Sequence, residues 1–416
     1  MIVLLPASLR SISTPPKRTH RSQLEVLAST ACERRFSMSE GDEVPQKAVA
    51  DPETYRESLD AWMKTQMPGA LELRVHDIDM PRSTGFSNET VFFSTTALEG
   101  GGTSGLPTTR KWVARIEPPD GGLFPVQTKE CEISCEVQHR IMSAVREAGV
   151  APIPEMLPFE KDLSVLGHPF FVMEFIEGLI PADVPRYTQA GFLVDDATPA
   201  NRETMVREAC ETMATLAGLD WKVMGLDWLD VRGEGTPAFR DQLGLYRDYC
   251  VEAVGDRDHP IIMKGLDWLE ANAPDLPIGI SWGDSRLGNI IWQDYHCASV
   301  CDWEAISLCP PEADIGWFVM FDRMSHEDFD APRLAGFPTR AEQVSIWEAR
   351  SGRKVADTID YWEIFGAMRF DAIMIKLGDR MVRAGIMPEE HSIAIDNGTT
   401  ESLERLLGRQ GVEIRA

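Results

Sequence analysis

The spacing of apolar residues changes part-way along this chain of 416 residues, and that change limits the folds it can adopt. Between residues 71 and 176, short runs of β-branched and aromatic residues alternate with turn signals, which is typical of an antiparallel sheet. From Asn201 onward, helical spacing dominates. The pattern predicts an α+β chain with a small sheet lobe, a larger mainly helical lobe, and a cleft where they join near residues 174–178.

The individual elements follow from the same periodicity. A leading helix is predicted at residues 52–67, and a helix at residues 131–148 is stopped by Gly149. Five strands of the small lobe are predicted at residues 71–78, 89–95, 111–117, 155–159 and 169–176. In the large lobe, helices are predicted at residues 203–219, 236–254, 261–273, 340–351, 358–384 and 401–407. Short strands are expected between these helices, at residues 278–282, 289–293 and 298–302.

Charge and composition exclude several classes of partner. The formal net charge of −25 argues against nucleic acid, because binding a polyanion requires clustered Lys and Arg. No run approaches the roughly 18–20 apolar residues that a membrane-spanning helix needs, so no membrane partner is expected. The eight cysteines are scattered and predict reduced thiols rather than disulfides. A soluble cytoplasmic protein with a small-molecule partner is expected, and a homodimer is compatible with the sequence.

The first residues differ from the rest. Residues 1–37 are rich in Arg, Ser and Pro, whereas the chain turns acidic directly after Met38. Two interpretations stay open: an organellar transit peptide, or a disordered extension from an upstream start codon, which we prefer. We therefore expect this extension to be followed by a leading helix and nucleotide-binding lobe at residues 38–176. A helical lobe with the catalytic loop and acceptor pocket is expected at residues 177–416.

The strongest chemical signal is the segment SWGDSRLGN, residues 281–289, followed by CDWE at residues 301–304. Asp284 and Asn289 stand five apart and Asp302 follows thirteen residues later, which is the layout of phosphoryl-transfer sites. Asn289 and Asp302 supply hard oxygens suited to Mg²⁺, and Asp284 can accept the proton of an attacking hydroxyl. Each piece alone is also a common turn motif, so the prediction depends on their combination.

These segments, together with PPEADIGW, resemble the catalytic and metal-binding motifs of the aminoglycoside phosphotransferase family. The resemblance covers roughly residues 67–408 and implies a protein-kinase-like fold that uses ATP and Mg²⁺. It also implies that Asp314 buttresses the catalytic loop, although a carboxylate at a helix start fits equally well. Arg286 and Glu304 are expected to support the same site.

The small lobe supplies candidate nucleotide contacts. Arg115 stands where kinases carry a phosphate-contacting Lys, and Glu136 in the next helix is predicted to pair with it, with a surface cation and a solvated acidic face as the alternatives. Ser87 and Asn88 resemble the family's nucleotide loop, for which a plain hairpin turn is the alternative. In LGHPFFVMEFIEG, Met173 is expected to flank adenine, and the backbone of residues Glu174, Phe175 and Ile176 is expected to meet its edge.

Two residues depart from the family pattern. Trp282 stands where many members carry His before Gly-Asp, and Ala217 stands where a helix end often carries His. The leading hypothesis is an ATP-dependent small-molecule kinase whose acceptor is a hydroxy acid, a hydroxyacyl-CoA or an aminoglycoside-like compound. The resemblance of KWVARIEPPDGGLFP and FFVMEFIEG to kinase-like domains of hydroxyacyl-CoA metabolism favours the first two. The alternative is a nucleotide-binding pseudokinase that serves as an interaction or sensing module.

Overall fold

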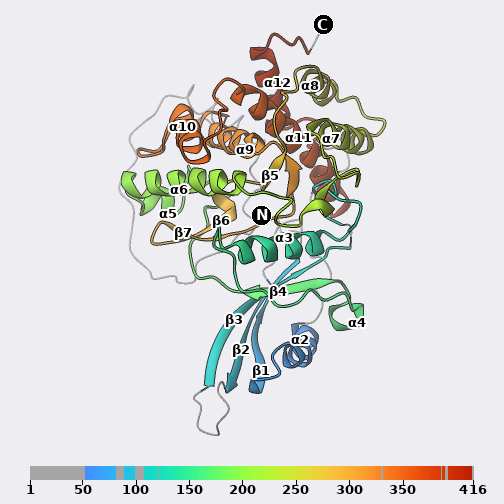
Figure 1. Ribbon diagram of the computed structural model, residues 1–416, viewed down its shortest axis with the longest axis vertical. Helices are drawn as coiled ribbons and strands as arrows, with labels where there is room; N and C mark the ends of the chain where they lie inside the picture. The colour runs from blue at the N-terminus through green and yellow to red at the C-terminus, as the bar shows by residue number, and fades with distance from the viewer. Residues whose placement is uncertain are drawn as a thin grey trace.

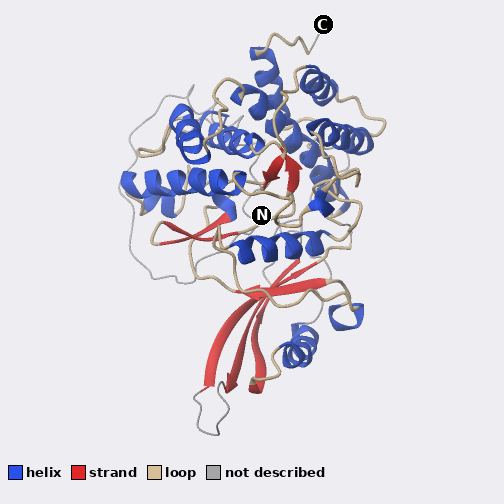
Figure 2. Cartoon of the chain, viewed as in Figure 1, coloured by secondary structure: helices blue, strands red, loops and turns tan. Residues whose placement is uncertain are grey.

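The chain forms a small sheet lobe and a large helical lobe, as Figure 1 shows. The computed structural model describes residues 52–80, 89–98, 107–119, 121–328, 331–385, 387–388 and 392–414. The prediction of an α+β, two-lobed fold is confirmed: an antiparallel sheet comes first, and helices make up most of the remainder (Figure 2).

The small lobe is a four-stranded antiparallel sheet in the order β1-β2-β3-β4. Its strands are β1 (Leu71–Asp79), β2 (Glu89–Leu98), β3 (Pro107–Ile116) and β4 (Phe170–Glu174). Successive side chains along each strand point to opposite faces of the sheet, and both faces are covered. Trp112 and Phe170 pack with the leading helix α2 (Pro52–Gln66), whereas Val113 and Phe171 share a core with α3 (Ser134–Ala148). The helix α3 therefore lies between the sheet and the large lobe.

One predicted strand of the small lobe is wrong. Residues 155–159 form no strand and contribute one isolated bridge, from Met156 to Met173, and the next residue, Glu160, forms another with Phe170. Pro154 and Pro158 bracket this segment and cannot donate to a ladder, which explains why pairing stays local. The short helix α4 (Leu163–Leu166) separates it from β4.

The six helices predicted for the large lobe are confirmed. They are α6 (Pro199–Ala217), α7 (Phe239–Val254), α8 (Pro260–Ala271), α10 (Arg340–Ser351), α11 (Ile359–Arg383) and α12 (Gly398–Arg409). Short helices also occur, namely α5 (Phe192–Asp195), η1 (Asp227–Leu229), η2 (Leu287–Asn289) and the π-helix η3 (Met324–Asp328). The strands β5 (Gly279–Ser281), β6 (Ile290–Gln293), β7 (His296–Val300) and β8 (Ser307–Cys309) form two small sheets, β5-β8 and β6-β7.

The helix α9 (Glu312–Arg323) was not predicted, and its surroundings explain why. Every one of its residues is buried, so it shows no division into an apolar and a polar face. It packs closely against α11: a Cβ atom on Gly316 would stand 2.3 Å from Cβ of Trp362. This buried helix carries several of the side chains that surround the candidate site. Among the described residues, none of the helices is long and apolar enough to cross a membrane.

Candidate active site

The loop that follows β5 is hydrogen-bonded to the carboxylate of Asp314, which lies in the first turn of α9. Asp314 accepts hydrogen bonds from Ser281 Oγ at 2.7 Å, from the backbone N–H of Trp282 at 2.8 Å and from that of Gly283 at 2.9 Å. Burial raises the pKa of Asp314, and these donors act in the opposite direction. The carboxylate therefore fixes three successive residues immediately before Asp284.

Gly283 is the residue that lets the loop turn at this point. Its φ of +89° lies in the left-handed region, and a Cβ atom would stand 2.0 Å from the carbonyl oxygen of Ala305. The same residue's carbonyl accepts a hydrogen bond from Arg369 Nη2 at 3.0 Å. Only glycine fits this position, and the turn places Asp284 at the head of the loop.

Three side chains donate to the carboxylate of Asp284. Asn289 Nδ2 lies 2.7 Å from Oδ2, and Trp317 Nε1 lies 3.0 Å from Oδ1. Arg286 Nε lies 3.2 and 3.3 Å from the two oxygens. These donors come from the loop itself and from α9, so the carboxylate has one defined orientation. Asp284 is buried, with 6 % of its surface exposed.

The segments that carry Asn289 and Asp302, the two predicted metal ligands, lie side by side. Cys301 N donates to the carbonyl of Asn289 at 2.9 Å, which joins the two segments. The Asn289 amide nitrogen donates to both the carbonyl and the carboxylate of Asp284, at 2.8 and 2.7 Å, so its Oδ1 points away from that residue. Asp302 is buried, and its backbone has a φ of +59°, in the left-handed region.

This pair of oxygen donors fits a magnesium ion that shares its remaining ligands with phosphates and water. Within the described residues, no group of three or more His, Cys, Asp or Glu side chains forms a self-sufficient metal site. A site completed by a nucleotide needs no such group. Burial raises the pKa of Asp302, while the positive charges of Arg115 and Arg286 lower it.

The predicted ion pair between Arg115 and Glu136 is not formed. Glu136 pairs instead with Lys161 Nζ at 2.8 Å, and Arg115 Nη1 donates to Thr90 Oγ1 at 3.0 Å. The register explains the second contact, because Thr90 and Arg115 are direct cross-strand partners on β2 and β3. Arg115 is buried and lies close enough to Asp302 to influence its charge. Arg115 therefore lacks the helix partner that we expected.

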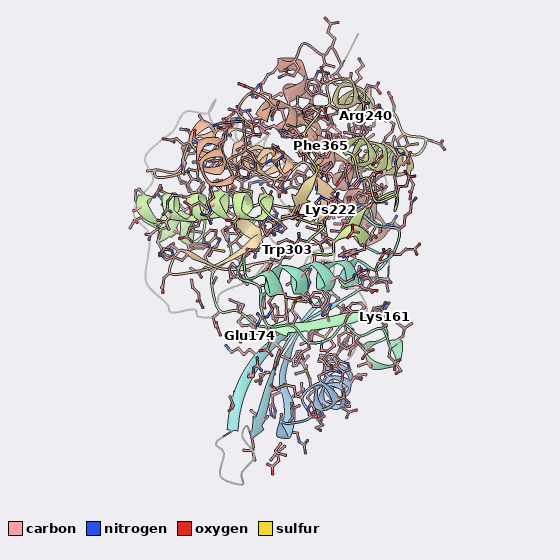
Figure 3. All side chains as sticks on the ribbon, viewed as in Figure 1. Lys161, Glu174, Lys222, Arg240, Trp303 and Phe365 are labelled. Atoms are coloured by element: carbon pink, nitrogen blue, oxygen red, sulfur yellow. The ribbon has the colours of Figure 1, made fainter. Side chains whose placement is uncertain are left out.

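The predicted adenine-contacting strand has one donor left for a ligand. The N–H groups of Glu174 and Phe175 donate to the carbonyls of Glu155 and Lys111, at 2.8 and 2.9 Å. No such bond engages the N–H of Ile176 within the described part of the chain. Met173 is buried in the core that includes α3. Figure 3 labels Glu174 at the end of β4. Ser87 and Asn88, the predicted phosphate-loop contacts, lie outside the described residues.

The family model described as "Phosphotransferase enzyme family" matches residues 80–349, which is more than half of the chain. The chain belongs to this family. Among curated proteins, Acyl-CoA dehydrogenase family member 11 of Rattus norvegicus is 27 % identical over 329 residues, covering 75 % of this chain and 37 % of that protein. The Homo sapiens protein of the same name is 28 % identical over 275 residues, covering 62 % of this chain and 32 % of its own length. The chain thus spans about a third of these relatives.

Solved phosphotransferases and kinases share the fold. A putative aminoglycoside phosphotransferase from Ralstonia eutropha matches with a TM-score of 0.59 and 22 % identity, covering 85 % of this chain and 98 % of the other. The ethanolamine kinase of Plasmodium vivax matches with a TM-score of 0.51 and 12 % identity, covering 91 % and 100 %. A mutant of aminoglycoside phosphotransferase APH(4)-Ia in ternary complex with AMP-PNP and hygromycin B has a TM-score of 0.50 and 15 % identity, covering 85 % and 99 %.

Two residues that support the site in this family member were missed by sequence reasoning. Trp317 donates to Asp284, and Arg369 donates to the Gly283 carbonyl and to Tyr246 Oη, at 3.0 and 2.9 Å. The Arg369 guanidinium also lies 4.8 Å from the ring centroid of Trp317. A lone arginine in the apolar run FGAMRFDAIM was the available signal, because a buried charge requires partners.

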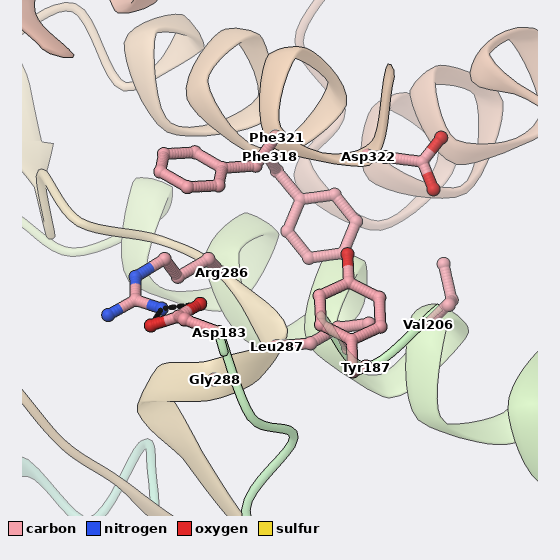
Figure 4. Close-up of a pocket in the computed structure, with 9 residues that line it drawn as sticks. All are labelled: Asp183, Tyr187, Val206, Arg286, Leu287, Gly288, Phe318, Phe321 and Asp322. Atoms are coloured by element: carbon pink, nitrogen blue, oxygen red, sulfur yellow. Dashed lines mark hydrogen bonds and ion pairs between the residues drawn. The ribbon is translucent and has the colours of Figure 1, made fainter. Parts of the chain in front are cut away.

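A narrow pocket lies beside the catalytic loop, on the large-lobe side (Figure 4). Arg286 at its edge donates from Nη1 to both carboxylate oxygens of Asp183 at 2.9 Å, besides its contact with Asp284. Burial lowers the pKa of Arg286, but the two carboxylates outweigh that effect and raise it. The wall is formed by side chains from α6, η2, α9 and the segment after β4: Tyr187, Val206, Leu287, Phe318, Phe321 and Asp322. Glu304 is buried in the segment after Asp302.

Proposed function

We propose that this chain is an ATP-dependent phosphotransferase that moves the γ-phosphoryl group to a hydroxyl of a small molecule. The observation that carries the proposal is the Asp284 carboxylate, which hydrogen bonds from Asn289, Trp317 and Arg286 hold in place. A backbone hydrogen bond from Cys301 to Asn289 joins the segment that carries Asp302 to the same loop. A carboxylate oriented by fixed donors, next to a pair of hard oxygens, fits the positioning that phosphoryl transfer requires.

In this mechanism, Asp284 accepts a hydrogen bond from the acceptor hydroxyl and takes its proton as the oxygen attacks the γ-phosphorus. The bond from this phosphorus to the oxygen that bridges the β- and γ-phosphates breaks, and ADP leaves. Asp314 and Gly283 fix the backbone from which Asp284 projects, so the hydroxyl is aimed without reorganisation of the loop. Arg115, a buried residue of β3, would contact the phosphates. Asn289 Oδ1 and the Asp302 carboxylate would hold Mg²⁺, which supplies charge neutralisation on the phosphate oxygens.

The pocket of Figure 4 is the proposed acceptor site, because Arg286, Leu287 and Gly288 of the catalytic loop form one side of it. Its two carboxylates are already paired with arginines: Asp183 with Arg286, and Asp322 with Arg333. A polycationic aminoglycoside would therefore find no free negative charge among these residues. The cavity holds only about 10 Å³, so acceptor entry requires side chains such as Tyr187 to move.

Within the small-molecule class, a hydroxy acid or a hydroxyacyl thioester is the acceptor we favour. The aromatic and aliphatic pocket wall suits an acyl chain, and curated relatives carry the name Acyl-CoA dehydrogenase family member 11. The chain matches only about a third of those proteins, so the phosphotransferase activity that we propose concerns this matched region and not the rest of the relatives.

A nucleotide-binding pseudokinase is the second candidate, and one observation favours it. Active protein kinases require an ion pair between a Lys on the third strand and a Glu on the next helix. The residues predicted to form its counterpart do not meet, because Glu136 pairs with Lys161 and Arg115 bonds to Thr90. The pseudokinase hypothesis predicts that the protein binds nucleotide but shows no magnesium-dependent turnover.

The test is release of ADP from ATP and Mg²⁺ across hydroxy acids, hydroxyacyl-CoA esters and aminoglycosides, with Asp284→Ala as the control. Acceptor-dependent release that Asp284→Ala abolishes would support the kinase, and the productive acceptor would identify the class. ATP binding without release for any acceptor would favour the pseudokinase instead.

A further inference from the structure

Trp282, where the family often carries His, has an indole that connects the two halves of the candidate active site. Its Nε1 donates to the carbonyl oxygen of Cys301 at 3.1 Å and to that of Asp302 at 3.2 Å. Its backbone N–H donates at the same time to Asp314. One residue therefore joins the buttressed catalytic loop to the backbone of the candidate metal ligand.

The backbone that this indole contacts is unfavourable by itself. Asp302 has φ of +59°, a region that costs a residue with a Cβ atom free energy, so its surroundings must impose it. The carbonyl held by Trp282 belongs to the same residue, and fixing that peptide plane restrains the direction in which the carboxylate projects. The indole itself is 1 % exposed and packs against Trp303, with ring centroids 5.8 Å apart.

We propose that Trp282 is a positioning residue for the metal site: its indole N–H holds Asp302 in the conformation that presents its carboxylate to a divalent cation. The inference rests on the proposed function, because it concerns the cation that accompanies the nucleotide there. Under this inference, Trp282 keeps a ring N–H donor at the position where the family often carries His, and the substitution does not indicate that the metal site has been lost.

The decisive variant is Trp282→Phe, which removes the N–H and keeps most of the ring. We expect the affinity for Mn²⁺ at saturating ADP, measured by the electron paramagnetic resonance of free Mn²⁺, to fall about tenfold. Affinity for ADP in the presence of EDTA should change by less than about twofold, because no metal is involved. Trp282→His, which restores a ring N–H, should recover part of the lost Mn²⁺ affinity and serves as the second variant if the first does not fold.

Trp112→Phe is the matched control. It removes another buried indole bond, from Nε1 to Thr95 Oγ1 at 2.8 Å, in the sheet away from the catalytic loop. It should lower the melting temperature comparably and leave Mn²⁺ affinity unchanged. Equal Mn²⁺ affinity in Trp282→Phe and the wild type, or an equal loss in Trp112→Phe, would overturn the inference. A wild-type protein that binds no Mn²⁺ with ADP would contradict the proposed function as well.

Discussion

The catalytic loop of the large lobe and the nucleotide side of the small lobe differ in how their charged groups are paired. Around the loop, Asp284 and Asp314 each accept several hydrogen bonds from fixed donors. In the small lobe, Arg115 and Glu136 each bond to a residue other than the predicted one. The difference teaches that the loop around Asp284 is held in one arrangement by fixed donors, whereas Arg115 has no ion-pair partner on α3; under the proposed function, Arg115 would contact the nucleotide without that support.

Gly283→Ala should have the largest effect. The new Cβ atom would stand 2.0 Å from a backbone oxygen in a region of positive φ, so the loop must shift. We expect a loss of about 3 kcal/mol or more in the free energy of unfolding and no measurable turnover. Gly352→Ala is the control, because Gly352 also has positive φ but open space around it, and should cost only about 1 kcal/mol. Equal losses in urea unfolding would contradict the close-contact argument.

Asp314→Asn should have the second-largest effect. An amide keeps one acceptor oxygen but replaces the other by an NH2 group, whose N–H donors would oppose the donors that this oxygen now meets. We expect kcat to fall about a hundredfold, with roughly 2–4 kcal/mol lost in unfolding free energy. Asp267→Asn, at a largely exposed surface pair with Arg247, should change neither measurably. A normal kcat in Asp314→Asn would remove the claim of a preorganised loop.

Arg115→Ala tests the other side of the comparison. We expect the Kd for ATP, measured by calorimetry, to rise about tenfold, because a buried guanidinium that contacts phosphate contributes roughly 1.5–3 kcal/mol. Unchanged ATP affinity would show that Arg115 only supports the sheet through Thr90.

Glu136→Gln should have the smallest effect. Its partner Lys161 is largely exposed, so the pair contributes at most about 1 kcal/mol, and kcat/KM for ATP should change less than about threefold. A loss as large as that of Arg115→Ala would mean that nucleotide binding draws Glu136 to Arg115, and would erase the difference between the lobes.

The elements that the sequence predicted well are those with a clear period. The amphipathic helices of the large lobe and most strands of the small lobe are confirmed. The helix α9 was missed because it is buried on all sides, and the strand at residues 155–159 failed because prolines limit its pairing.

The residues of the candidate site also fall into those that the sequence indicated and those that it did not. Spacing along the chain indicated Asp284, Asn289 and Asp302, which the structure brings together. It could not reveal Trp317 and Arg369, which reach the loop from helices distant in sequence. Nor could it decide the partner of Glu136, because that choice depends on the register of β2 with β3 and on the position of Lys161.

The most direct test of the central claim separates nucleotide binding from phosphoryl transfer in Asp284→Asn. With the acceptor identified by the ADP-release panel, transfer of labelled γ-phosphate would be measured in single turnover, and ATP affinity by calorimetry on the same protein. We expect transfer to fall about a thousandfold while the Kd for ATP stays within about threefold of the wild-type value. Transfer that stays within about tenfold of wild type would contradict the role of Asp284 as base.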